Sequence, residues 1–131
     1  MKKNYLLTGL VLAVSIFLLS FLLVQEQWTV PDKYKNMKNP NAGKTDSDQI
    51  GKSLYLKQCK SCHGVKGKGD GPKASMLETK ITDFSSEKFK AQSDGELYYK
   101  TFVGKGEMPG FESKVETDED KWFLINYIKA F

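Results

Sequence analysis

The sequence predicts an all-α protein in which a single N-terminal transmembrane helix precedes a small helical domain. Residues 5–24, YLLTGLVLAVSIFLLSFLLV, form an uncharged and almost entirely apolar block. Apolar residues near the C-terminus recur at helical spacing, and no segment alternates convincingly as a β-strand. We therefore divide the chain into an anchor (1–24), a polar tether (25–47) and a helical domain (48–131).

The apolar block predicts a membrane anchor because of its length. At ~1.5 Å per residue, a helix over 5–24 covers ~30 Å, the thickness of the hydrocarbon core of a bilayer. A cleaved secretory signal, which also begins with a basic stretch such as MKKN, is the alternative. Signal cores usually span about 7–15 residues and end at a small-x-small site, whereas this run continues into VQEQW. We therefore expect a retained anchor.

Residues 25–47 predict a tether. They are polar, contain two prolines and show neither helical nor strand periodicity. A sequence as specific as VPDKYKNMKNP suits docking onto a partner better than free swinging.

Helices are predicted at both ends of the domain and between them. The first covers DQIGKSLYLKQC, where Ile50 and Leu54 share a face. A second begins at Ser93, which forms a capping-box pattern with Glu96 ahead of LYYKTF. Thr117 and the acids after it are a good start for the last helix, since they satisfy unpaired amides and the helix dipole. Its apolar face comprises Leu124, Tyr127, Ile128 and Phe131.

The segment CKSCHG contains both cysteines and the only histidine of the chain. Cys59, Cys62 and His63 have the C-x-x-C-H spacing of c-type haem attachment. Two thiols one helical turn apart can add to the two vinyl groups on one porphyrin edge, while the next side chain brings an imidazole to the iron. The motif therefore predicts one covalently attached haem c.

Other uses of this motif fit less well. A structural zinc site needs four ligands, and the chain has only three Cys and His side chains. A thioredoxin-like pair should lie near a βαβ pattern, and strand-like runs are missing. A disulfide between positions three apart would stabilise little. A thiol–disulfide protein without haem remains an alternative, which free thiols and no visible absorption would identify.

An electron-transfer haem needs a second axial ligand, and no second histidine exists. Met108, in GKGEMPGF, is flanked by glycines and a proline that build an irregular loop able to present a thioether from the far face. Met1 starts the chain, Met37 lies in the tether, and Met76 follows His63 closely. We expect Met108 to be the ligand, with Met76 in reserve.

Residues 48–131 resemble a class I cytochrome c, a bacterial monohaem electron carrier, over the whole domain. In the first helix Gly51 and Tyr55 match the family, and in the last helix Leu124 and Tyr127 occupy its crossing positions. The resemblance implies that the terminal helices cross, with Gly51 allowing close approach. It also implies that the carbonyl of Pro72 accepts a proton from the second nitrogen of His63.

The resemblance implies a function: single electrons carried between membrane respiratory complexes, from a quinol-oxidising complex to a partner such as a terminal oxidase. The chain would then not be an enzyme. The alternative is a fixed haem c subunit of a larger membrane oxidoreductase. The expected location is the bacterial cytoplasmic membrane, single-pass, with the N-terminus inside, the lipid bilayer as a partner and the haem domain on the periplasmic or outer face.

The charge distribution predicts a docking face. Residues 52–73 hold six lysines against one acid, and 112–120 hold five acids against one lysine. The lysines are candidates for steering an acidic redox partner: Lys52, Lys57, Lys60, Lys66, Lys68 and Lys73. The chain has no arginine and no basic-aromatic pattern, so we expect no nucleic-acid binding. The carboxylates Asp70, Asp83 and Glu107 are scattered, and we expect them to be solvated.

Overall fold

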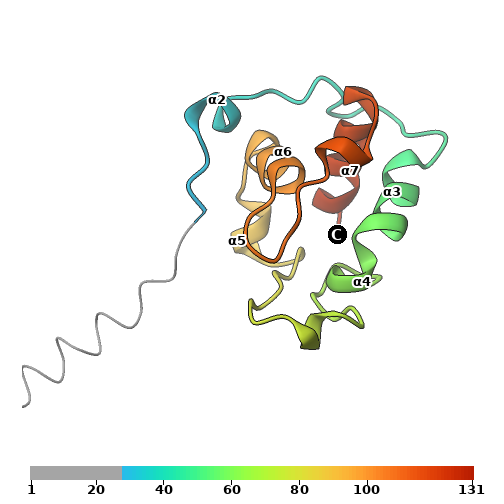
Figure 1. The fold of residues 1–131 in the computed structure, drawn as a ribbon. Coiled ribbons are helices and arrows are strands. Elements are labelled where there is room, and N and C mark those ends of the chain that lie inside the picture. The colour runs from blue at the N-terminus through green and yellow to red at the C-terminus, as the bar shows by residue number, and fades with distance from the viewer. Residues whose placement is uncertain (1–27) are drawn as a thin grey trace, which may run out of the picture.

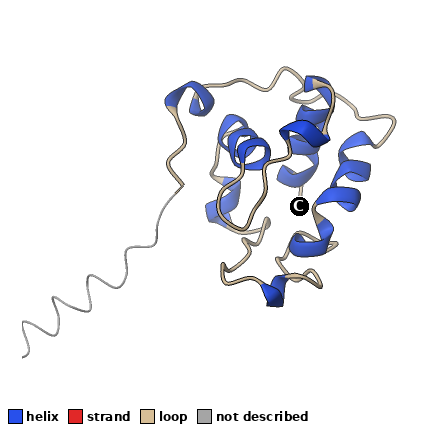
Figure 2. Cartoon of the chain, viewed as in Figure 1, coloured by secondary structure: helices blue, strands red, loops and turns tan. Residues whose placement is uncertain are grey.

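The computed structural model describes residues 28–131, which form helices joined by long loops and contain no β-strand (Figure 2). The all-α prediction is confirmed for these residues. In chain order the elements are α2 (Asp32–Lys35), α3 (Ile50–Gln58), α4 (Lys60–His63), the 3-10 turn η1 (Ala74–Met76), α5 (Glu87–Lys90), α6 (Asp94–Val103), the 3-10 turn η2 (Glu112–Lys114) and α7 (Asp118–Lys129).

The predicted location as a single-pass protein of the bacterial cytoplasmic membrane is corrected by the structure. Within residues 28–131, no helix has the length and apolar character needed to cross a bilayer. The longest, α7, has 12 residues, hence ~18 Å of rise against a hydrocarbon core of ~30 Å. The predicted span at 5–24 lies outside the described residues.

Helices α3 and α7 pack side by side (Figure 1). A methyl group on Gly51 would lie 2.7 Å from the carbonyl carbon of Phe123 and 3.0 Å from Cβ of Tyr127. Only a residue without a side chain permits this approach. The close crossing of the first and last helices, expected at Gly51, is therefore confirmed.

Local capping signals fix where α6 and α7 begin. Ser93 Oγ accepts a hydrogen bond from the Glu96 amide at 3.2 Å, and the Glu96 carboxylate accepts one from the Ser93 amide at 2.8 Å. Thr117 Oγ1 accepts from the Asp120 amide at 3.1 Å. These bonds satisfy amides that have no partner within the helix. Both predicted helix starts are confirmed.

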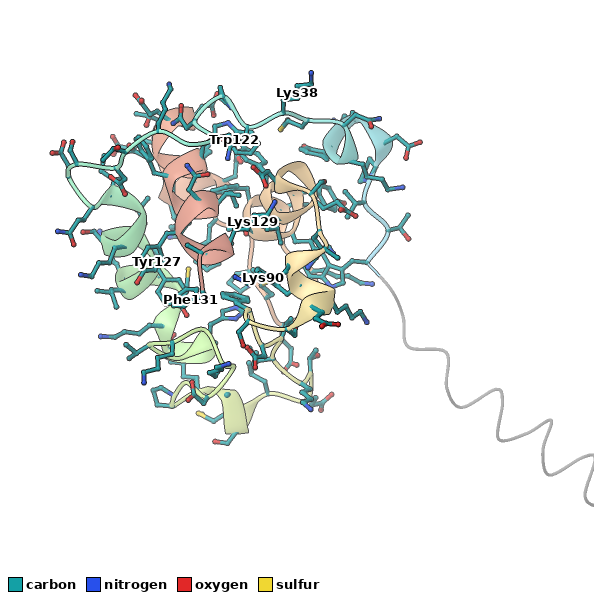
Figure 3. The ribbon with its side chains drawn as sticks, turned by 180° about the vertical axis from the view of Figure 1, so that it is seen from behind. Lys38, Lys90, Trp122, Tyr127, Lys129 and Phe131 are labelled. Atoms are coloured by element: carbon teal, nitrogen blue, oxygen red, sulfur yellow. The ribbon has the colours of Figure 1, made fainter. Side chains whose placement is uncertain are left out.

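The core lies where α3, α6 and α7 meet. Its largest fully buried side chains are Tyr55, Leu97, Phe102, Leu124 and Ile125. The end of the chain folds back onto this core, where the rings of Phe131 and Tyr55 have centroids 5.0 Å apart. Lys90 donates to the carbonyl oxygens of Lys129 and Phe131, and Figure 3 shows Lys90 and Phe131 close together. The C-terminus is thus fixed to α5.

Residues 28–46, most of the predicted tether, pack against the domain, and we name them the strap. The strap includes α2 and runs past the ends of α6 and α7 (Figure 1). Its Val30 and Asn41 are buried. The rings of Tyr34 and Tyr99 have centroids 4.8 Å apart. A methyl group on Gly95 would overlap the carbonyl oxygen of Tyr34, so the strap and α6 are in direct backbone contact.

Asparagine side chains hold the second half of the strap. Asn39 Nδ2 donates to Asp94 Oδ2 at 3.0 Å and to Asn126 Oδ1 at 2.7 Å. Asn41 Nδ2 donates to the carbonyl of Glu119 at 3.2 Å, and its own carbonyl accepts from Asn126 at 2.9 Å. These bonds join the strap to both α6 and α7. The polar composition that predicted a tether therefore supplies specific contacts with the domain.

Candidate functional site

The two cysteines and the histidine lie on one helical turn at the junction of α3 and α4. Cys59 follows α3 and caps the start of α4, which contains Cys62 and His63. The carbonyl of Cys59 accepts from the amides of Cys62 at 3.1 Å and His63 at 3.0 Å. No disulfide joins the two cysteines, and both side chains are half-buried. The three residues of the motif therefore lie close together in space.

One pocket brings two members of this cluster, Cys59 and His63, together with Met108, whereas Cys62 is not among its lining residues. Besides Cys59, His63 and Met108, its lining comprises Phe84, Thr101, Leu124 and Ile128. These residues come from the α3–α4 junction, the segment before α5, α6, the loop after α6, and α7. The lining is almost wholly apolar. The imidazole of His63 and the sulfur atoms of Cys59 and Met108 are its groups best suited to bind a metal.

The loop of Met108 turns tightly after α6. The amide of Lys105 donates to the carbonyl of Met108 at 2.9 Å, and the amide of Met108 donates back at 3.1 Å. Gly104 enters this turn at φ +75, where a side chain would be strained. Met76, the reserve ligand, is 79% exposed and is not among the residues lining the pocket. The structure thus places Met108, and not Met76, beside His63.

The imidazole of His63 is held in apolar surroundings. Its ring stacks on Phe84, with centroids 4.6 Å apart and planes inclined by 27°. Burial lowers the pKa of His63, so the neutral ring, which can bind a metal, is favoured. Nδ1 is buried and has no hydrogen-bond partner within residues 28–131. An unsatisfied buried nitrogen in this pocket fits an imidazole that binds an iron-bearing group.

The hydrogen bond expected between His63 and the carbonyl of Pro72 stays a prediction, since Nδ1 of His63 has no partner within residues 28–131. The loop that carries Pro72 nevertheless folds back onto the motif. The amide of Gly71 donates to the carbonyl of Cys62 at 3.1 Å, and that of Lys73 donates to Ser61 at 2.8 Å. Residues 64–73, which contain four glycines, therefore turn tightly against the turn that bears the cysteines.

Tyr55 of α3 forms a hydrogen bond with the residue that follows the motif. Its side chain is fully buried, and its hydroxyl donates to the carbonyl of Gly64 at 2.5 Å. Burial, reinforced by the neighbouring Cys59, raises the pKa of Tyr55, so the hydroxyl keeps its proton and remains a donor. This bond fixes the backbone directly after His63.

The burial of Cys59 disfavours a thiol-redox role. Burial, with a further contribution from Cys62, raises the pKa of the Cys59 thiol to about 12. Reactive redox thiols instead have a lowered pKa, because the thiolate is the nucleophile. The thiol–disulfide alternative loses support on this ground.

Two of the three scattered carboxylates, Asp83 and Glu107, have partners that the sequence did not indicate. Glu107 Oε1 accepts from the amide of Glu78 at 3.2 Å, and Oε2 accepts from that of Thr79 at 2.8 Å. The two backbone bonds lower the pKa of Glu107. Asp83 forms an ion pair with Lys68 at 3.3 Å and accepts from Ser85. Of the three, Glu107 matters most for the site, since it directly precedes Met108.

Sequence reasoning also missed Phe84 and Thr101, which line the pocket. An isolated aromatic or hydroxyl residue carries no spacing signal, so only the fold could place them there.

Comparisons with known proteins agree with this site. Residues 46–128 match the family model described as cytochrome c oxidase, cbb3-type, subunit III. No curated protein sequence is similar enough to count as a match. Among solved structures, the chain is similar to one from the reducing HAO-like protein complex of Kuenenia stuttgartiensis, with 28% identity and a TM-score of 0.59. The match covers 85% of this chain and 53% of that one, so the present chain corresponds to about half of its neighbour.

The family match spans most of the described helices and both cysteines of the motif, and the family carries haem c. The chain therefore belongs to the family of the cbb3-type cytochrome c oxidase subunit III model, and it is a class I c-type cytochrome with one covalently bound haem c.

Proposed function

We propose that the protein carries single electrons through a haem held by four side chains of residues 48–131. Cys59 and Cys62 would form the thioether bonds to the haem, and His63 and Met108 would bind its iron. One observation carries the proposal: Cys59, His63 and Met108 line a single apolar pocket although Met108 lies 45 positions beyond His63 in the sequence.

When bound, haem c supplies an iron that exchanges one electron between its ferric and ferrous states. The thioether of Met108 and the apolar lining both favour the ferrous state, so the potential should exceed that of a bis-imidazole site. With His63 and Met108 both bound to the iron, no position would be left open for a substrate. No group placed as a catalytic base lines the pocket described above. These features favour an electron carrier over an enzyme.

The first prediction tests the axial ligand. Met108→Ala should abolish the charge-transfer absorption of a thioether bound to ferric haem and lower the reduction potential, because water or another weak ligand replaces sulfur. Met76→Ala is the matched control, since that side chain is exposed and outside the pocket. The measurement is an oxidised and a reduced spectrum of each purified protein, with a potentiometric titration.

Covalent haem should persist in all samples, because both cysteines remain. A thioether band that survives Met108→Ala but disappears in Met76→Ala would overturn this choice of ligand.

We further propose that the electrons come from a quinol-oxidising complex and pass to a more oxidising partner such as a terminal oxidase. The six lysines of 52–73 are all exposed, and they lie on α3, on α4 and in the loop that follows α4. An acidic partner surface would be attracted to them. Their exposure supports docking beside the haem attachment site.

A second candidate is a fixed haem c subunit of a larger oxidoreductase. The description of the matched family names an oxidase subunit, and the similar solved structure comes from a protein complex. Purification of the tagged chain at low and high salt separates the two. A fixed subunit would retain stoichiometric partners after a high-salt wash, whereas a shuttle held by surface charges would lose them.

A further inference from the structure

Glu107 links two loops that are far apart in the sequence. Its two carboxylate oxygens accept hydrogen bonds from different backbone amides, those of Glu78 and Thr79, at 3.2 and 2.8 Å. The bonds span 29 and 28 positions of the chain. They join the loop that carries Met108 to the segment that follows η1.

The bonded segment is irregular. Glu78 and Thr79 lie between η1 and α5, outside any helix, so no helical ladder supplies acceptors for their amides. A charged carboxylate accepts stronger hydrogen bonds than a neutral oxygen does, and the bond from Thr79, at 2.8 Å, has the length of such a bond. The carboxylate of Glu107 is therefore a specific anchor for this segment.

We propose that Glu107 is a positioning residue for Met108, acting as a latch that holds the Met108 loop over the pocket. This inference depends on the proposed ligation by Met108. Because Glu107 and Met108 are adjacent, tying the carboxylate to residues 78 and 79 restrains the backbone from which the thioether extends. The latch thereby controls how readily the thioether leaves the iron and an external ligand takes its place.

The fold should not depend on this latch. Glu107 is exposed, and its bonds lie outside the core. Backbone hydrogen bonds between Lys105 and Met108 close the turn that carries Met108. Further along the segment between α6 and α7, Glu112 forms an ion pair with buried Lys121 at 2.5 Å. Removing the carboxylate of Glu107 should loosen the loop while the helices stay packed.

The experiment uses the full chain with its haem and measures imidazole binding to the ferric protein by stopped flow. Glu107→Ala removes both bonds, and Glu107→Gln keeps one acceptor oxygen but replaces the other with a donor. Glu116→Ala, an exposed carboxylate in the same α6–α7 connection, is the matched control. Thermal unfolding of each protein is recorded beside the binding rates.

We expect Glu107→Ala to retain the thioether absorption in the absence of imidazole and to bind imidazole about tenfold faster, a change typical of losing hydrogen bonds to a charged group. Glu107→Gln should fall between Ala and wild type, and Glu116→Ala should match wild type. Binding that is unchanged in Glu107→Ala, or a lower unfolding temperature with unchanged binding, would overturn the latch. Failure of the proposed ligation appears separately, as a thioether absorption that Met108→Ala leaves intact.

Discussion

Single residues at the crossing of α3 and α7 determine how closely these helices approach. Gly51 provides the space, and Tyr55, one turn further along α3, fills the interior and bonds to Gly64. The ring of Tyr55 also lies against Tyr127, with centroids 5.4 Å apart. Because Cys59 directly follows α3, a shift of α3 against α7 would also move Cys59 in the haem site.

Gly51→Ala should therefore destabilise the protein. Alanine favours helix formation by up to about 1 kcal/mol relative to glycine. Its methyl group, however, would overlap the backbone of Phe123, and overpacking of this kind costs about 1–3 kcal/mol. We expect a net loss of stability, measured by denaturant unfolding of the haem-loaded protein.

Ser53→Ala, at an exposed position of the same helix, is the control and should leave stability nearly unchanged. Equal stability of Gly51→Ala and wild type would mean that the helices can separate without cost.

Among the elements, those encoded by local signals could be predicted from the sequence. The starts of α6 and α7 follow from residues within one turn, Ser93 with Glu96 and Thr117 with Asp120. The short helices α2 and α5 were not predicted, because four residues carry too little periodicity. The sequence therefore predicted the fold class and the long helices, but it did not predict the structure of the segments between them.

The strap shows why composition alone was insufficient. Its polar residues predicted a tether, yet Asn39 bonds to Asp94 and Asn126, which lie 55 and 87 positions away. Contacts between residues so far apart in the sequence produce no periodic pattern from which they could be predicted. The site follows the same rule, since the spacing of Cys59 and Cys62 was recognisable, whereas the bonds of Glu107 needed the fold.

Asn39→Ala should release the strap. The substitution removes two bonds to the helices and the acceptor for the amide of Asn41 at 2.8 Å, at a cost of about 1–2 kcal/mol in stability. Hydrogen exchange followed by mass spectrometry should show faster exchange across 28–46.

Asn36→Ala, at an exposed position of the same strap, is the control for this experiment and should exchange like wild type. Unchanged protection in Asn39→Ala would mean that aromatic and backbone contacts hold the strap without the asparagine.

At the scale of the whole molecule, one lysine of the strap and one lysine next to Cys59 lie at different ends of the domain. Lys38 lies on the strap (Figure 3), whereas Lys60 begins α4, at the opposite end of the domain in Figure 1. Both are exposed. The two positions allow the local field around the haem attachment site to be separated from the net charge.

Lys60→Glu should slow electron transfer to an anionic oxidant. The reduced protein gives one electron to ferricyanide, which becomes ferrocyanide, and positive charge beside the turn that bears the cysteines attracts this reagent. We expect the second-order rate at low ionic strength to fall several-fold. The difference should disappear as added salt shortens the Debye length to about 3 Å at 1 M.

Lys38→Glu changes the formal charge by the same amount at the remote end, so it should slow the reaction much less. A cationic cobalt complex as oxidant should show the reverse order, with Lys60→Glu reacting fastest. If both variants slowed ferricyanide equally, net charge alone would govern the encounter, and the lysines around the cysteine turn would have no special part in docking.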